Sequence, residues 1–418
     1  MGLAAATLTD TQACPVLFEQ RVLLNVRYWH RYVVDQHGNV AGLDRERERI
    51  VKAISFGLDL GRQIWPDVFM LIRAYTRHME IRGYWENWDQ LLNRALAIAQ
   101  QTNDSDGIIT LSVLLARLAQ RRGHSRQVTS HYRRALRLAR QTGNRYEEAR
   151  TCTNLGYFFI EQGHWRRAEA LCGHALQLFA ELDSDHGRAH TENHLGLLYT
   201  RQSQWDKARD HLERACAIWQ SMGDQHGLTY GFINFGKLYN DAGIPDQALP
   251  YLEKAQRQAM LIGSEADLGK IDLLIGSTYR LKGNPGQAEE YIRQAETIYK
   301  KLSNLAELAR VWNNLGQVYL YQGKLAEAHH YLKTSLEVRR KLGLRFDEIY
   351  SLIHLIEYDL VRGYRSQAMA QLSQVKRLIE QNRYAGLAYY LQTLLDNYEH
   401  LLLDESRQTS EVVKTSEV

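Results

Sequence analysis

The chain has 418 residues, of which 44% are hydrophobic and 24% are charged, and its formal net charge is +4. This composition is typical of globular proteins, and a charge this small does not by itself indicate a nucleic-acid partner. No stretch of about 18 consecutive apolar residues occurs, which excludes a predicted transmembrane helix.

The amino-terminal sequence MGLAAATLTD lacks the basic segment of a signal peptide. The cysteines at positions 14, 152, 172 and 216 lack the C-x-x-C spacing of a metal site. We expect them to be reduced, and those at 152, 172 and 216 to be small core residues. We therefore expect a cytoplasmic protein with no membrane partner.

The first 64 residues contain two stretches with helical periodicity, FEQRVLLNVRYWHRYVV and LDRERERIVKAISFGLDLG. In each stretch, apolar residues recur three and four positions apart. We expect residues 1–64 to form a helical cap that precedes a longer array.

From about residue 83 to residue 368 the sequence repeats itself every forty residues. Apolar residues recur with helical spacing over 148–161 and again over 165–180, so each unit is predicted to be a helical hairpin. Four columns of the repeat hold small residues, and the two glycine columns are represented by Gly156, Gly196, Gly236, Gly276 and Gly316, and by Gly163, Gly243, Gly283, Gly323 and Gly363.

The two glycine columns have different predicted roles. Gly163 lies between the two helices of its unit, where a left-handed residue ends a helix. Gly156 lies inside a helix, where glycine is less favourable than alanine by up to about 1 kcal/mol. That loss must be offset by packing, because a missing side chain lets two helices approach closely.

The pattern L-G-x-x-Y followed by G and A, as in Leu315-Gly316 with Tyr319, Gly323 and Ala328, resembles the tetratricopeptide repeat. The usual repeat has about 34 residues, and this one has forty. The resemblance implies an all-α fold, a right-handed α-solenoid of about eight helical hairpins with helical caps at both ends. We expect the array over residues 65–384, a capping helix over 385–404 and a disordered tail over 405–418.

The long repeat is similar to the sensor arrays of bacterial STAND-type signalling ATPases and to peptide-binding adaptors. Those ATPases also contain a P-loop, and the sequence GFINFGKL at 231–238 has Leu238 where a Ser or Thr must bind magnesium. We expect no nucleotide or other cofactor in this chain. A separate signalling or ATPase subunit remains a candidate partner.

In this family the first helix of each hairpin lines the concave groove, and the residue before the L-G pair faces that groove. The resemblance therefore assigns Asn154, His194, Asn234, Leu274, Asn314 and His354 to one groove column. An asparagine amide can bind both the C=O and the N–H of an extended peptide. The alternative is that these asparagines brace adjacent helices.

Further polar side chains share this helix face at spacings of three, four and seven. A groove of cations, amides and phenols suits an acidic or carboxylate-bearing peptide. These candidate peptide-binding residues are Arg150, Tyr157, His190, Asn193, Tyr230, Lys237, Lys270, Arg310, Asn313 and Gln317.

Arginine greatly outnumbers acidic residues between positions 117 and 150. Arginine favours carboxylates and phosphates, so this surface is a candidate for an acidic partner or nucleic acid, with ordinary solvated surface as the alternative. The candidate basic patch consists of Arg117, Arg121, Arg133, Arg137 and Arg140.

His186, His190 and His194 are spaced by four and would share one helical face, which is the geometry of a two-histidine metal pair. No HExxH-type carboxylate motif accompanies them, so we expect groove contacts and no metal. The sequence also contains no recognisable catalytic motif.

The sequence therefore predicts a non-catalytic protein–protein interaction scaffold, a sensor or adaptor in bacterial signalling or regulation. Its ligand would be an extended segment of another protein, bound in the concave groove. Two alternatives remain: a receptor for a small peptide or small molecule, and binding of nucleic acid or an acidic partner through residues 117–150.

Overall fold

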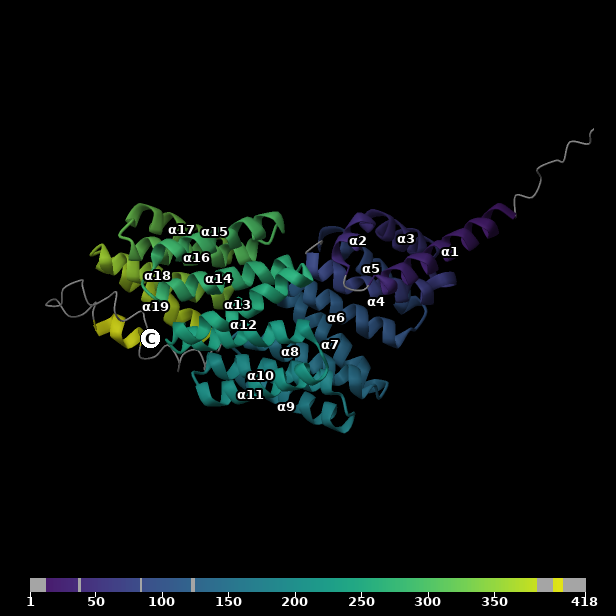
Figure 1. The fold of residues 1–418 in the computed structure, drawn as a ribbon, viewed down its shortest axis with the longest axis horizontal. Coiled ribbons are helices and arrows are strands. Elements are labelled where there is room, and N and C mark those ends of the chain that lie inside the picture. Colours follow the sequence, from purple (N-terminus) through teal and green to yellow (C-terminus); the bar gives the residue numbers. More distant parts are fainter. Residues whose placement is uncertain (1–12, 37–38, 83–84, 122–124, 382–393, 401–418) are drawn as a thin grey trace, which may run out of the picture. The chain divides into compact units, whose positions relative to one another are not determined.

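The structure is a computed structural model that describes residues 13–36, 39–82, 85–121, 125–381 and 394–400. The described residues form helices joined by short turns, and no strand occurs among them (Figure 1). None of these helices is both long and apolar enough to cross a membrane. Contacts divide the chain into two units, residues 1–115 and 116–418.

The first unit is a helical bundle in which α1 packs against α3 and α4. The indole nitrogen Nε1 of Trp65 donates to Oδ2 of Asp104 at 2.8 Å, which ties α4 to the turn before α6. The two helical stretches predicted in the first 64 residues correspond to α1 and to α2 with α3. The helices are α1 (Ala13–Asp35), α2 (Val40–Arg45), α3 (Arg47–Leu60), the 3-10 helix η1 (Gly61–Ile64), α4 (Trp65–Arg82), α5 (Trp85–Gln101) and the first part of α6 (Ser105–Arg121).

The second unit is built from helices that pack in consecutive pairs, α8 with α9, α10 with α11, and so on to α18 with α19. This arrangement confirms the predicted all-α solenoid of helical hairpins. Its helices are the end of α6, α7 (Ser125–Gln141), α8 (Arg145–Glu161), α9 (Trp165–Glu181), α10 (Asp185–Arg201), α11 (Trp205–Ser221), α12 (Gln225–Asp241), α13 (Pro245–Ile262), α14 (Glu265–Leu281), α15 (Pro285–Lys301), α16 (Leu305–Tyr321), α17 (Leu325–Lys341), α18 (Arg345–Val361) and α19 (Arg365–Gln381).

The predicted array over 65–384 crosses the boundary between the two units, and its limits stay a prediction. The predicted disordered tail lies outside the described residues. Of the predicted capping helix, residues 394–400 are described, and they are helical.

The turns between helices have the predicted left-handed residues. Gly163 and Gly243 have φ values of 70° and 71°, and Ser203 occupies the same column with φ 55°. Between successive hairpins, Gly223 has φ 66° and Asp183 has φ 48°. A left-handed residue after each helix reverses the chain within a very short turn. These short turns are compatible with a constant forty-residue period.

The glycine column inside the first helices marks close contact with the second helix of the same hairpin. A Cβ added to Gly236 would lie 2.3 Å from Cδ2 of Leu252, and one added to Gly196 would lie 2.6 Å from Cδ2 of Leu212. Both leucines are fully buried. The predicted reason for these glycines, close approach of two helices, is confirmed.

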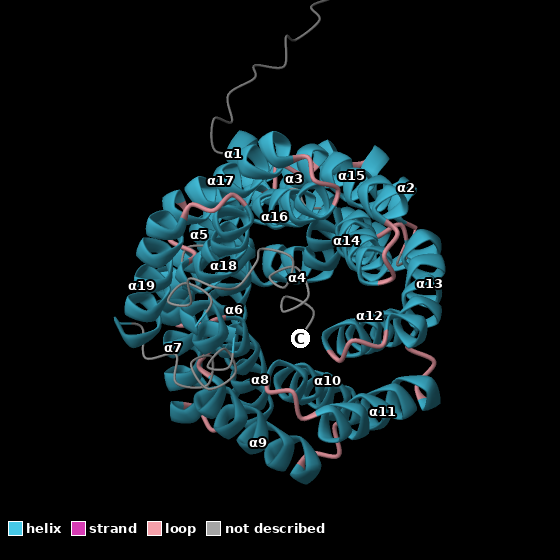
Figure 2. Ribbon diagram, turned by 90° about the vertical axis from the view of Figure 1, so that its left-hand side faces the viewer, coloured by secondary structure: helices cyan, strands magenta, loops and turns pink. Residues whose placement is uncertain are grey.

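The first helices form the inner layer of the second unit, and the second helices form the outer layer. Figure 2 shows α8, α10, α12, α14, α16 and α18 inside, with α9, α11, α13, α15, α17 and α19 outside. We call the side chains that α8, α10, α12, α14, α16 and α18 present inward the inner face.

Replacing Gly236 by alanine should destabilise the fold by about 1–3 kcal/mol, because the new methyl group overlaps Leu252. The matched control is Gly173→Ala in α9, since no atom lies within 4 Å of its added Cβ. That change should stabilise the fold by up to about 1 kcal/mol through helix propensity. Urea unfolding followed by circular dichroism measures both, and equal midpoints for the two variants would contradict the packing role.

Candidate ligand-binding inner face

The predicted asparagine column lies on the inner layer, but its amide groups already have protein partners. Nδ2 of Asn154 donates to the backbone oxygen of Arg150 at 2.8 Å, and Nδ2 of Asn314 donates to that of Arg310 at 2.9 Å. Asn234 is buried, and its Nδ2 donates to Oδ1 of Asn193 at 3.0 Å. The last bond joins α12 to α10, which is the bracing role that the sequence left open. Each of these bonds occupies one of the two N–H donors of its amide.

The two histidines of this column are neutral at physiological pH. Burial lowers the pKa of His194 to about 4, and its ring lies 4.8 Å from that of Tyr157. Burial, followed by the charges of Arg280 and Arg339, lowers the pKa of His354 to about 3. The ring nitrogens of His354 lie 2.8 Å from Nδ2 of Asn313 and 2.6 Å from Nε2 of Gln317. The positive charge of the inner face therefore comes from lysine and arginine.

Predicted cations on the inner face have acidic neighbours at different distances. Nζ of Lys237 lies 2.7 Å from Oδ2 of Asp241, whereas the guanidinium of Arg310 lies 3.4 Å from Glu307. Burial and the charge of Arg201 lower the pKa of Lys237 to about 8, although Asp241 acts to raise it. Burial also lowers the pKa of Lys270.

Three other predicted peptide-binding residues already contact side chains of the protein. Arg150 pairs with Glu147 at 2.6 Å on its own helix. The ring of Tyr230 packs edge-on against that of His226 with centroids 4.7 Å apart, and His190 packs edge-on against Trp219 at 5.2 Å. The predicted residues thus share the inner layer, but they are not one continuous cluster.

Arg201 is an inner-face residue that the sequence analysis missed. It lies in the last turn of α10, seven residues after His194, so helical periodicity alone places it on the same face. Its Nε atom is buried and has no hydrogen-bond partner within the described part of the chain. Burial acts to lower the pKa of Arg201, and Tyr350 of α18, followed by Asp241 and Glu161, acts to raise it.

Charges from opposite parts of the inner layer act on one another. Glu161 at the end of α8 raises the pKa of Arg310 in α16, where the largest cause is Glu307. Glu161 also opposes the effect of burial on Lys270 in α14. The curvature visible in Figure 2 therefore brings separate repeats into one electrostatic environment.

The arginines of the predicted basic patch do not form one surface among the described side chains. Arg133, Arg137 and Arg140 are exposed on α7, and Nε of Arg140 is bound to Glu148 at 2.7 Å. Arg117 is half-buried, and its charge contributes to the lowered pKa values of His190 and His194, after burial as the main cause. Arg117 therefore acts electrostatically on two inner-face histidines. The side chain of Arg121 lies outside the described residues.

The helix at 394–400 packs against the last repeats of the array. The hydroxyl of Tyr398 donates to Oε1 of Glu357 at 2.7 Å, and both side chains are buried. Burial raises the pKa of Glu357 to about 7, with the bond from Tyr398 acting in the opposite direction. This carboxyl group is thus largely protonated in mildly acidic solution.

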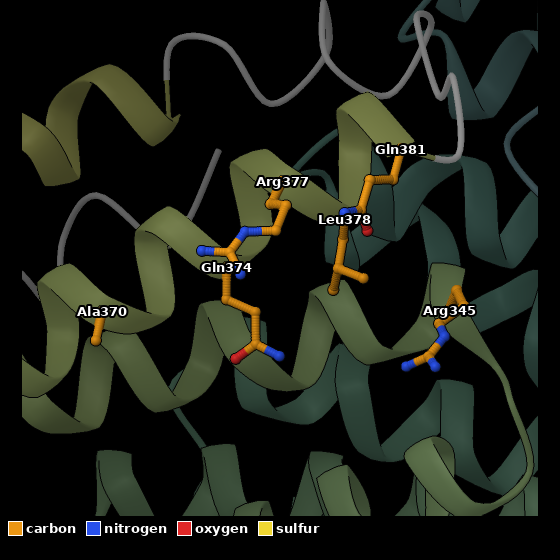
Figure 3. Close-up of a pocket in the computed structure, with 6 residues that line it drawn as sticks. All are labelled: Arg345, Ala370, Gln374, Arg377, Leu378 and Gln381. Carbon is orange, nitrogen blue, oxygen red and sulfur yellow. The ribbon is translucent and has the colours of Figure 1, made fainter.

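A cavity of about 490 Å³ lies between the start of α18 and α19 (Figure 3), and none of the predicted residues lines it. Two of its polar groups already have protein partners, since Arg345 binds Glu348 at 2.7 Å and Gln374 accepts from Arg340 at 3.1 Å. The cavity is lined by Arg345, Ala370, Gln374, Arg377, Leu378 and Gln381.

The family model of the tetratricopeptide repeat matches residues 146–221, 191–260 and 267–341. The matched helical hairpins are therefore tetratricopeptide repeats. No curated protein sequence matches the chain.

Solved structures with a similar fold include aspartyl phosphate phosphatase F from Bacillus subtilis, with a TM-score of 0.53 at 13% identity over 90% of this chain and 95% of that chain. NprR in complex with its cognate peptide NprX has a TM-score of 0.50 at 16% identity, over 65% of this chain and 77% of that chain. A STAND protein with a tetratricopeptide repeat sensor from Pyrococcus horikoshii has a TM-score of 0.48 at 12% identity, over 85% and 55% of the two chains. At these identities the likeness of the first two structures concerns the fold alone.

The contribution of Glu357 to the stability of the fold should decrease as the pH rises from about 4.5 to about 7. The folded protein holds the Glu357 proton up to about pH 7, whereas the ordinary value of 4.5 applies to the unfolded chain. Because Glu357 binds its proton more tightly in the folded state, its own contribution to stability falls with rising pH, whereas the buried histidines His194 and His354 contribute in the opposite direction.

Glu357→Gln removes this titration and keeps a side chain that can bond to Tyr398. Between pH 5 and pH 8 the urea midpoint of the variant should therefore rise relative to that of the unmodified chain. An identical pH dependence in both proteins would contradict the raised pKa.

Proposed function

We propose that the inner face binds an extended, carboxylate-bearing segment of another protein. The chain then acts as a non-catalytic scaffold, a sensor or adaptor in cytoplasmic signalling. The observation that carries this proposal is Arg201, whose buried Nε has no hydrogen-bond partner within the described residues and whose guanidinium interacts with charged side chains of other repeats.

The state of Arg201 favours an anionic ligand. Leaving a buried donor unsatisfied costs about 1–3 kcal/mol, more for a charged group. Arginine has five N–H donors in a planar fork that matches a carboxylate with two parallel bonds. Asp241 and Glu161 influence Arg201 electrostatically without providing an acceptor for its Nε. A carboxylate from a ligand would supply the missing acceptor.

Neighbouring cations extend this preference along the inner layer. Lys237, Lys270 and Arg310 come from α12, α14 and α16, in the order in which the repeats are stacked. The lowered pKa of Lys270 reflects an ammonium group that burial disfavours, and a nearby carboxylate would favour its charged form. An extended chain can pass such a series of repeats with acidic side chains spaced along it.

Two further observations support a peptide ligand and a cytoplasmic location. The fold is shared with NprR, whose structure holds its cognate peptide, so this architecture can accommodate a peptide. Cys152, Cys172 and Cys216 are free thiols, which suits a reducing compartment.

A fluorescein-labelled hexa-glutamate peptide tests this proposal by fluorescence anisotropy, with hexa-glutamine as the neutral comparison. The chain should bind hexa-glutamate more tightly, and added salt should weaken binding. Arg201→Gln should weaken it at least about tenfold, because a charge-assisted bond contributes about 1.5–3 kcal/mol.

Arg137→Gln is the matched control, since it removes the same charge from the exposed surface of α7. It should leave the affinity unchanged. If Arg137→Gln weakens binding and Arg201→Gln does not, the ligand binds the arginines of the outer layer and the proposal is wrong. In that case a single-stranded DNA oligonucleotide is the next probe for the outer surface.

A further inference from the structure

Three potential metal ligands from two adjacent repeats meet at the start of α10. His186 and His190 are one helical turn apart, and their ring centroids are separated by 4.6 Å. Asp224 precedes the first residue of α12, and its Oδ2 lies 3.9 Å from Nε2 of His186. One donor atom from each of the three side chains lies within 4.8 Å of the others.

The carboxylate of Asp224 is held in a fixed orientation. Its Oδ1 accepts from the backbone nitrogen of Gly227 at 2.9 Å and so caps the amino end of α12. The second oxygen is left to face His186. A side chain that is already fixed by its other oxygen loses little conformational freedom when it binds a ligand.

Trp219 positions His190 and Asp224. It is fully buried, and its ring packs edge-on against His190 with centroids 5.2 Å apart. A Cβ on Gly227 would lie 2.4 Å from Cδ1 of Trp219, so the backbone that holds Asp224 also rests on this ring. His190 and Asp224 are thus placed by one rigid side chain. His186 is less constrained, since its side chain is 54% exposed.

We propose that His186, His190 and Asp224 bind a divalent transition-metal ion such as Zn²⁺. Two imidazoles and one carboxylate are a donor set that Zn²⁺ accepts, at about 2.0–2.2 Å from each donor. Donors of a tetrahedral ion are about 3.4 Å apart, so the three side chains need only modest rotation to close around it. Three protein ligands leave a coordination position open for water or for a donor from a bound partner.

The ion would link two repeats. His186 and His190 belong to α10, whereas Asp224 lies at the junction between α11 and α12. A metal held by both would restrict the movement of α12 relative to α10. Because α10 and α12 both contribute to the inner face, a bound metal ion would stiffen that part of the inner face.

The next repeat provides a comparison within the same chain. Forty residues after the three ligands stand His226, Tyr230 and Ser264, so a single histidine remains there. Nε2 of His226 lies 3.9 Å from Oδ2 of Asp267, the same separation as between His186 and Asp224. A histidine–carboxylate contact is therefore present in both repeats, and the second histidine distinguishes the proposed site.

Isothermal titration calorimetry of the full chain without an affinity tag, with Zn²⁺ as the probe, tests this proposal. We expect one ion per chain at this site. Asp224→Asn keeps the cap of α12, because asparagine can also accept from Gly227, but it removes the negative charge. Asp224→Asn and His190→Gln should each weaken binding about tenfold or more, and His226→Gln should leave it unchanged.

Co²⁺ provides a second measurement, since its visible absorption strengthens when protein ligands replace the six waters of the free ion. The unmodified chain and His226→Gln should show this change, and His190→Gln should lose it. Absence of metal binding by the unmodified chain, undiminished binding by Asp224→Asn and His190→Gln, or equal loss in His226→Gln would each overturn the proposal. Circular dichroism of each variant distinguishes loss of the site from loss of the fold.

Discussion

In the hairpins from α8 with α9 to α16 with α17, close contact between a glycine of the first helix and a side chain of the second helix fixes the geometry on which the inner face depends. Gly196 and Gly236 have no side chain, so Leu212 and Leu252 pack directly against the helix backbone. This contact recurs at the forty-residue period, with Gly316 and Leu332 in a later repeat. Similar packing in these hairpins keeps the first helices in one layer. Their polar residues consequently face the same side.

The sequence was sufficient to predict the features that depend on spacing along the chain. Left-handed turn residues such as Gly243, and the buried contact at Gly236, follow from the repeat period because each arises within one hairpin. The bond between Asn193 and Asn234 could not be predicted, since it joins side chains forty-one positions apart in different repeats. Asp224 was missed for the same reason: its neighbours His186 and His190 lie in the preceding repeat.

The polar side chains of the inner layer differ in whether they bond to other groups of the protein. Asn193 with Asn234, and Thr153 with Thr191 at 2.8 Å between hydroxyl oxygens, bond to one another and hold neighbouring helices together. Arg201 is different, because its buried Nε has no such partner within the described residues. Position on the helical face does not separate the bonded side chains from Arg201, because both occur on the same face. The distinction depends on which side chains of the next repeat come within bonding distance.

The central claim is that ligands bind the inner layer and not the outer one. Leu274 belongs to the inner-face column and has an apolar side chain, so it can be replaced by the photoreactive residue benzoylphenylalanine without loss of a hydrogen bond. Gln294, exposed on the outer helix α15, is the matched outer position. Irradiation with labelled hexa-glutamate peptide should link the peptide to the chain carrying the probe at 274 and not to the chain carrying it at 294. Crosslinking from 294 alone would contradict an inner binding face.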